Sequence, residues 1–350
     1  MLEWLIVTNI KEILAAYQVN PSEISKVTNK LYKVQSHNYT YALKESSLTS
    51  NDLQRWRSVY RIGNDQQLAS VLPVYMTNSG DIYQEHKGNI YYLSPWKEKR
   101  ESDEPEHEIE SFYHALGHMH NKTKQENRVH MEKLEELIQQ EKESVSSYRN
   151  TLLAHIETYE QRRYMSPFEL RVCMQYRDLE QVFKNLDSWY DYYLTDLKDD
   201  GVSYSSLCHG NLRPSHRIYQ ASHTYFINWE TANFGSPVND LASYFYHEFK
   251  YHDCYFNHLT DSFSIYERYN PLLQSERSLL AIYLLTPSAY LQIIDNYNRA
   301  VYKKSQPFQI KYLEQAYRRL MHGLSMQHYL YQVRKSIIEK EQASDNDEHT

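Results

Sequence analysis

The sequence predicts an α+β fold of two lobes, in which a small lobe built around a β-sheet precedes a larger, mostly helical lobe. A chain of 350 residues is long enough for two lobes that share a cleft. Residues 24–45 and 71–96 have the alternating, β-prone character of strands, with turn residues between them. From Pro105 onward, apolar residues recur at helical spacing instead. We therefore place the small lobe at residues 1–93 and the helical lobe at residues 94–340.

The small lobe begins with an apolar segment that we interpret as an amphipathic helix. Residues 1–20 carry Glu3, Lys11 and Glu12, and they lack the basic start and the small-residue cleavage site of a signal peptide. A second helix is expected over residues 52–68, between the two groups of strands.

The helical lobe contains a predicted pair of long helices, inserted at about residues 122–195. The second helix starts at Ser166-Pro167-Phe168-Glu169, where an N-cap serine, a first-turn proline and a capping-box glutamate stand in order. The apolar stripes of the pair also fit coiled-coil seams, but packing on the helical lobe is the favoured interpretation. Residues 341–350 have no large apolar side chain, so we expect a disordered acidic tail.

Composition and charge argue against several classes of protein. The net charge is -7 and basic residues form no long stripe, which argues against binding to nucleic acid. No run of 18 or more apolar residues is present, so we predict no membrane span. The cysteines Cys173, Cys208 and Cys254 are far apart in the sequence, as expected for reduced thiols in a cytosolic protein. They define neither a metal site nor a disulfide framework.

Tyrosine is unusually frequent and glycine unusually rare. The chain has 34 tyrosines and 8 glycines, whereas glycine makes up about 7% of an average protein. Tyrosine is suited to half-buried positions, and on composition alone we favour this explanation of the high tyrosine content. The alternative is that exposed tyrosines serve a dense, oxidatively cross-linked protein assembly. Few glycines leave few loops in which backbone amides can surround a phosphate.

The most informative segment is residues 207–249, where several short motifs follow one another. They are His209-Gly210-Asn211-Leu212, His216, Ile227-Asn228-Trp229-Glu230, Gly235-Ser236-Pro237 and Asp240-Leu241-Ala242. Their order and spacing resemble the catalytic and metal-binding segment of the aminoglycoside phosphotransferase and choline kinase superfamily. Thinner matches extend the resemblance to roughly residues 24–330; they are Tyr41-Ala42-Leu43-Lys44, Tyr91 to Trp96, and Leu116 to His120. The resemblance implies a bilobal, protein-kinase-like fold. In that fold Lys44 would hold nucleotide phosphates, and Tyr92 and Leu93 would lie at the hinge that touches adenine.

Three positions depart from the pattern of active family members. The aspartate that accepts the substrate's hydroxyl proton is Asn211 here, the main magnesium-binding aspartate is Asn228, and the metal-binding asparagine is His216. An amide cannot act as a base at neutral pH, and it replaces a carboxylate poorly at Mg²⁺. Losing general-base catalysis alone lowers a rate about 10²–10⁴-fold. The resemblance therefore implies a degenerate site with no functional catalytic residue, no metal and no cofactor, and we favour a protein that is not an enzyme.

The other residues of the motifs are expected to have structural roles. By resemblance, His209 and Asp240 form the pair that braces the catalytic loop, and Trp229 packs behind it. His216 is either a soft-metal ligand or a hydrogen-bonded loop histidine, and the second interpretation is favoured. The helix that follows Lys44 in the sequence offers no glutamate to pair with it. Lys44 is therefore interpreted either as an anion-binding residue or as a solvated lysine on a strand.

Within the superfamily, the layout is similar to that of the CotS-type kinase-like proteins of the Bacillus-type endospore coat, in particular their YutH-like branch. The shared features are a short small lobe, a tyrosine-rich large lobe and a helical pair before the His-Gly motif. This resemblance implies a pseudokinase that is made in the mother-cell cytoplasm during sporulation and deposited in the spore coat, as a scaffold for other coat proteins. Two alternatives stay open: an active small-molecule phosphotransferase that uses Mg-ATP, and a non-catalytic sensor of a nucleotide or metabolite.

Overall fold

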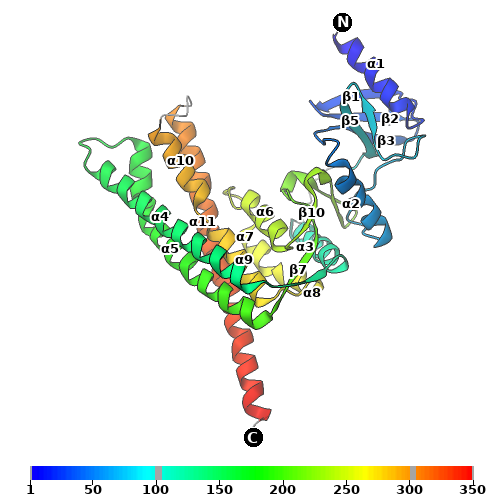
Figure 1. The fold of residues 1–350 in the computed structure, drawn as a ribbon. Helices are drawn as coiled ribbons and strands as arrows, with labels where there is room; N and C mark the ends of the chain where they lie inside the picture. The colour runs from blue at the N-terminus through cyan, green and yellow to red at the C-terminus, as the bar shows by residue number, and fades with distance from the viewer. Residues whose placement is uncertain (1, 99–104, 300–304, 349–350) are drawn as a thin grey trace. The chain divides into compact units, whose positions relative to one another are not determined.

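The computed structural model describes residues 2–98, 105–299 and 305–348 (Figure 1). It confirms the mixed α+β class, with an antiparallel sheet early in the chain and mostly helices later. Two compact units are present, Met1–Thr123 with Leu207–Phe234, and Lys124–Ser206 with Gly235–Thr350. This division does not follow the predicted boundary after residue 93.

The segment 207–234 belongs to the first unit because it bonds to the chain that leads into the sheet. The backbone N–H of Phe226 donates to the carbonyl of Ser70 over 2.7 Å. Helix α3 (Pro105–Lys122) packs on the same segment, with the rings of Phe112 and Phe226 6.1 Å apart. The predicted boundary therefore falls within the first unit, because tertiary contacts join parts of the chain that are far apart in sequence.

Five antiparallel strands form the sheet of the first unit, in the order β1-β2-β3-β5-β4. They are β1 (Glu23–Thr28), β2 (Leu31–Ser36), β3 (Tyr39–Ser46), β4 (Gln84–His86) and β5 (Asn89–Pro95). One face packs against α1 (Leu2–Ala15), the helix predicted at the start of the chain. The core between sheet and helix consists of Ile10, Ile13, Leu14, Tyr17, Val19, Tyr32, Val34, Leu43 and Leu93. Alternating burial along β2 follows from the two-residue period of a strand.

Helices and a small hairpin complete the first unit. Helix α2 (Leu53–Asp65) buries Trp56 and Val59. The helical spacing of apolar residues predicted from Pro105 onward is confirmed in α3, since Phe112, Tyr113, Leu116 and Met119 are all completely buried. The segment 207–234 contains the hairpin β8 (Arg217–Gln220) and β9 (His223–Phe226), with one 3₁₀ turn before it and one after it, η1 (Pro214–His216) and η2 (Trp229–Thr231).

The second unit is dominated by long helices. It contains β6 (Gln125–Arg128) paired with β7 (Val202–Cys208), whose last two residues belong to the first unit. Strand β10 (Asn233–Gly235) begins in the first unit and ends in the second. The helices of the second unit are α4 (Met131–Glu160), α5 (Pro167–Asp200), α6 (Val238–Glu248), α7 (Phe256–Asp261), α8 (Phe263–Tyr269), α9 (Gln274–Leu285), α10 (Ser288–Asn298) and α11 (Gln306–Glu348). Helices α4 and α5 are the predicted pair. The Ser166 cap is present as expected: its hydroxyl accepts from the Glu169 N–H (3.2 Å), and the Glu169 carboxylate accepts from the Ser166 N–H (2.8 Å).

Helix α5 packs within the unit rather than standing apart with α4. The indole of Trp189 donates to Gln327 over 2.7 Å, and Arg334 forms an ion pair with Asp196 over 2.6 Å. Both partners lie on α11. These contacts agree with packing on the helical lobe, the interpretation favoured over a free coiled coil.

Helix α11 runs to Glu348, so it enters the segment 341–350 that composition predicts to be disordered. Residues 339–343 are Glu, Lys, Glu, Gln and Ala. These residues have high helix propensity, so an existing helix continues into them at little cost. Residues 349 and 350 lie outside the described part of the chain.

One apolar stretch among the described residues, Gln274–Asn298, has the length and hydropathy of a membrane span. It consists of α9 and α10, interrupted at Thr286 and Pro287, and 56% of its apolar window is buried in the structure. Leu280, Ala281 and Leu285 are completely buried. The stretch therefore contributes to the core of the second unit.

Candidate functional site

The candidate site lies within the first unit and centres on Lys44 of strand β3. The Lys44 ammonium donates to the side-chain oxygen of Asn228, and to Glu230 Oε1 over 2.5 Å. Tyr92 is opposite Lys44 in the β3–β5 register and donates its hydroxyl to the same Glu230 oxygen over 3.2 Å. Three residues singled out in the sequence, Lys44, Tyr92 and Asn228, are thus brought together around Glu230.

Leu93 lies on the other face of the sheet. Its side chain is completely buried in the core beneath α1, and it is not among the residues that line the cavity beside Lys44. Successive side chains of a strand point to opposite faces, so Tyr92 and Leu93 cannot both face the same cavity. The Leu93 side chain therefore faces away from this cavity, whereas the Tyr92 side chain lines it.

Lys44 and Glu230 form a largely buried ion pair, with side chains 21% and 13% exposed. Burial lowers the pKa of Lys44, although the negative charge of Glu230 opposes this shift. Burial alone would raise the pKa of Glu230, but the Lys44 charge and hydrogen bonds outweigh it and hold that pKa below its ordinary value. Burial, followed by the charge of Glu230, raises the pKa of Tyr92 well above normal, so the phenol stays a hydrogen-bond donor. Glu230 is therefore a carboxylate that two donors hold in place.

Asn228 owes its position to an unusual backbone conformation. Its φ of 68° and ψ of 56° lie in the left-handed region, which asparagine tolerates better than most residues. The preceding residue, Ile227, is fixed on both sides: its N–H donates to the His216 carbonyl over 3.0 Å, and its carbonyl accepts from His209 Nε2 over 2.8 Å.

Asn211 is also held by a cation from the chain itself. Its side-chain oxygen accepts from two nitrogens of Arg213, Nε at 3.0 Å and Nη2 at 2.5 Å. His216 donates from Nδ1 to the Asn211 carbonyl over 2.9 Å. Burial, helped by the neighbouring His209, lowers the pKa of His216 to about 4, so its imidazole is neutral at physiological pH. The structure thus places His216 as a hydrogen-bonded loop histidine.

His209 and Trp229, the residues predicted to brace the catalytic loop, lie next to each other in the structure. His209 is completely buried, its Nδ1 accepts from the Asn211 N–H over 3.3 Å, and its ring lies 4.8 Å from that of Trp229. Gly210, which follows His209 in the sequence, has φ +76°. A Cβ atom at this position would lie 2.3 Å from the Thr231 carbonyl oxygen. Only glycine fits such a site without strain.

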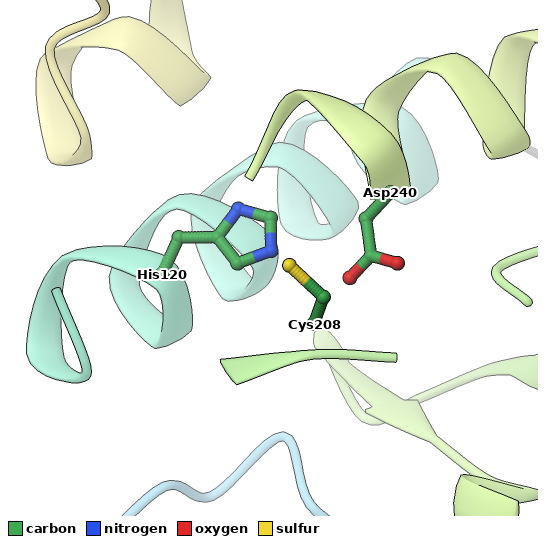
Figure 2. A group of neighbouring side chains, drawn as sticks. All are labelled: His120, Cys208 and Asp240. Atoms are coloured by element: carbon green, nitrogen blue, oxygen red, sulfur yellow. The ribbon is translucent and has the colours of Figure 1, made fainter. Parts of the chain in front are cut away.

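The remaining residue of the predicted brace, Asp240, belongs to the second unit. It lies in the first turn of α6 and is completely buried. Figure 2 draws it with His120, near the end of α3, and Cys208, at the end of β7, which are also completely buried.

A cavity of about 280 Å³ opens beside Lys44. Its walls are largely apolar, and the aliphatic ones come from Leu31, Ala42, Leu72, Val74, Ile218 and Ile227. At its polar end it borders a second cavity of about 220 Å³, and the two share Lys30, Lys44 and Asn228 as lining residues. The space beside Lys44 is therefore open and not filled by aromatic side chains.

The side chains at the polar end do not fit Mg²⁺. This ion favours carboxylate and phosphate oxygens in an octahedral arrangement. Here the side-chain oxygen of Asn211 accepts from Arg213, and the side-chain oxygen of Asn228 and Oε1 of Glu230 accept from Lys44. A divalent cation at these oxygens would lie next to an ammonium or guanidinium group, which is repulsive.

Two features of this arrangement were missed in the sequence. Glu230 is the partner of Lys44, although its position in the sequence does not indicate this pairing. Arg213, two residues after Asn211, received no role. Both pairings could have been inferred from the asparagines at positions 211 and 228. Where active family members have aspartates, Lys44 and Arg213 lack those negative charges and need other partners.

Comparisons with known proteins agree with this fold. The model of the phosphotransferase enzyme family (APH) matches residues 22–256, which is more than half of the chain, whereas no curated protein sequence matches. Among solved structures, the chain is similar to an aminoglycoside phosphotransferase from Alicyclobacillus acidocaldarius, with 14% identity, 93% of this chain and 96% of that chain covered, and a TM-score of 0.73.

Two further solved structures have the same fold. The AMP-bound spectinomycin phosphotransferase APH(9)-Ia shows 12% identity, covers 90% of this chain and 98% of its own, and has a TM-score of 0.55. The amicoumacin kinase hAmiN shows 13% identity, with coverage of 91% and 92% and a TM-score of 0.54. At such identities the likeness concerns the fold alone, but the family match extends over most of the motifs described above, and the chain therefore belongs to the phosphotransferase enzyme family.

Proposed function

We propose that this protein is a non-catalytic member of its family, a pseudokinase that acts as a binding module or scaffold. One observation carries the proposal: the side-chain oxygens at both degenerate positions, Asn211 and Asn228, are bonded to cations of the chain itself, Arg213 and Lys44. In this arrangement neither position can accept a proton or hold a metal.

Phosphoryl transfer depends on positioning and on charge compensation by metal ions. A neutral amide at position 211 removes the general base, at a cost of about 10²–10⁴ in rate. Loss of the metal removes several kcal/mol of transition-state stabilisation. Glu230 does not restore the missing function, because Lys44 and Tyr92 already hold its Oε1.

For the biological role, we infer a scaffold in endospore coat assembly, made in the mother-cell cytoplasm and deposited in the coat with other coat proteins. The support is the resemblance of the sequence layout to CotS-type proteins and the excess of tyrosine. Several tyrosines are open to solvent; Tyr39 is 67% exposed and Tyr164 is 79% exposed. A fluorescent fusion followed through sporulation tests this role: enrichment around the developing spore is expected, and a diffuse signal together with a normal coat in the deletion strain contradicts it.

A phosphotransfer assay tests the absence of catalysis. The wild-type protein is incubated with Mg-ATP and a panel of amino- and hydroxyl-bearing small molecules. We expect no transfer above that of Lys44→Ala. Activity in Asn211→Asp with Asn228→Asp, from an inactive parent, would identify the site as a relic of an enzyme. Transfer by the wild type that is lost in Lys44→Ala contradicts the proposal.

A second candidate function, a sensor of a nucleotide or metabolite, is favoured by the open cavity beside Lys44. Structural relatives were solved with AMP or AMP-PNP, and their fold is shared here. This candidate also needs no catalysis, so it differs from the scaffold only in requiring a ligand.

A further inference from the structure

We propose that His114 and His118 of α3 form a binding site for a divalent transition-metal ion, with two imidazole ligands from one helix face and water completing the coordination. The ions that suit such a site are Ni²⁺, Cu²⁺ and Zn²⁺ rather than Mg²⁺. The site uses none of the residues around Lys44, so it is independent of the function proposed above.

The pair is set by helical spacing. Of the 17 histidines in the chain, only His114 and His118 are four residues apart. Both lie within α3, and residues four apart are neighbours on the surface of a helix. Two histidines at this spacing supply two of the zinc ligands in helical metal sites.

The two imidazole rings lie side by side. Their centroids are 6.2 Å apart and their planes differ by 13°. An ion bound by both rings, at the usual metal–nitrogen distance of about 2.0–2.1 Å, needs coordinating nitrogens about 3 Å apart. His114 is exposed, so a small rotation of its side chain closes the pair on an ion that arrives from solvent.

The opposite face of α3 holds the helix in place. Phe112, Leu116 and Met119 are completely buried, and Ser111 accepts a hydrogen bond from Thr224 of the β8–β9 hairpin over 3.0 Å. Two ligands on a fixed helix lose little conformational entropy when an ion binds, because the backbone already places them next to each other.

Protonation of His118 does not compete with an ion at neutral pH. Burial, followed by the charges of His114 and Lys122, lowers the pKa of His118. Its imidazole is therefore neutral at pH 7, and neutral imidazole is the form that binds metals. Glu110 and Lys122 are both exposed and lie one turn before His114 and one turn after His118. Their opposite charges therefore largely cancel at the pair.

The chemistry of the donors selects the ion. Imidazole nitrogen suits Ni²⁺, Cu²⁺ and Zn²⁺, whereas Mg²⁺ prefers oxygen ligands. At a given nitrogen site the affinity for Cu²⁺ exceeds that for Ni²⁺ and for Zn²⁺. We therefore expect the pair to bind Cu²⁺ more tightly than Ni²⁺, and to ignore Mg²⁺.

Isothermal titration calorimetry of the untagged full-length protein with Ni²⁺ provides the test. We expect one saturable Ni²⁺ site in the wild type, and at least tenfold weaker binding in His114→Asn and in His118→Asn. Either substitution already removes the chelate, so the double variant should be at most about threefold weaker than either single variant. An excess of Mg²⁺ should leave the Ni²⁺ affinity unchanged.

His107→Asn is the matched control. His107 is an exposed histidine of the same helix, but it lies about two turns before His114 and cannot join the same chelate. His107→Asn should keep the wild-type Ni²⁺ affinity within about twofold. If the wild type binds no Ni²⁺, if His114→Asn and His118→Asn bind it as the wild type does, or if His107→Asn weakens binding as much as they do, the inference is overturned.

Electron paramagnetic resonance of the wild type needs no variant, so it decides the matter even if a substituted protein does not fold. With one equivalent of Cu²⁺, the spectrum should show coupling to the nitrogens of two imidazoles. Coupling to any other number of imidazoles overturns the inference.

Discussion

Replacement of Lys44 by methionine tests the ion pair on which the site depends. The variant keeps a side chain of similar length but leaves Glu230 buried without its cation. Exposed ion pairs contribute about 0–1 kcal/mol, whereas removing one partner of a buried pair costs about 3–5 kcal/mol. With side chains 21% and 13% exposed and a separation of 2.5 Å, this pair lies close to the buried class. We therefore expect Lys44→Met to lower the free energy of unfolding by about 3 kcal/mol at pH 7.

The loss of unfolding free energy caused by Lys44→Met should become smaller at lower pH. In the wild type the pKa of Glu230 is below its ordinary value. The pair therefore stabilises the fold above the unfolded pKa of about 4.3, and this contribution is lost as the pH falls through the folded pKa. Without Lys44, burial raises the pKa of Glu230, so acid relieves the buried charge of the variant. The difference between wild type and Lys44→Met should consequently shrink as the pH falls from 7 towards 5.

Urea unfolding followed by tryptophan fluorescence measures both effects. Trp56, Trp96 and Trp229 all lie in the first unit, and the ring of Trp56 is 5.1 Å from that of Tyr92, beside the pair. The double variant Lys44→Met with Glu230→Gln should regain about 2 kcal/mol, because no buried charge is left unpaired. A cost below about 1 kcal/mol for Lys44→Met, or a double variant no more stable than the single one, refutes the assignment of a buried ion pair.

Three further outcomes are expected. Gly210→Ala places a Cβ within 2.3 Å of the Thr231 carbonyl at φ +76°, and should cost at least about 2 kcal/mol in urea unfolding; a loss under about 0.5 kcal/mol contradicts the close approach. His216, whose pKa burial lowers to about 4, should show no titration of its ring proton shifts in NMR between pH 5.5 and 8, and a midpoint near 6.5 contradicts its burial. Ser166→Ala removes the cap of α5 and should lower stability by about 1 kcal/mol, with Ser166→Asp as the control that keeps an acceptor for Glu169 N–H; equal loss in both variants argues against the cap.

The sequence predicted those parts of the fold that depend on local pattern. Alternating residues at 31–46 became strands β2 and β3, the stripe ending at Met119 became the buried face of α3, and Ser166 caps α5. Each of these features is encoded within a few residues, by side-chain period or by a single cap.

The sequence did not predict features that depend on distant partners. Glu230 is 186 positions from Lys44, and nothing in the local pattern of either residue indicates that they pair. Tyr92 and Leu93 were both expected at the hinge that touches adenine, and the pleat of β5 turns their side chains to opposite faces.

The division of the chain into two units also depends on contacts between residues that are far apart in the sequence. The backbone of Phe226 bonds to Ser70, so that a late segment of the chain joins the early sheet. Burial patterns indicate that residues such as Phe112 and Phe226 are inside, but not which of them meet.

Thermal melting of the wild-type protein with ATP, in Mg²⁺ and separately in EDTA, tests the central claim most directly. The claim is that Asn211 and Asn228, held by Arg213 and Lys44, leave no functional metal site. A ligand at about 100 times its dissociation constant stabilises a fold by about 2.7 kcal/mol, which a melting curve detects readily. We expect the same melting temperature with ATP in Mg²⁺ as in EDTA. A stabilisation by ATP that requires Mg²⁺ would show that the metal site survives, and would contradict the loss of metal binding.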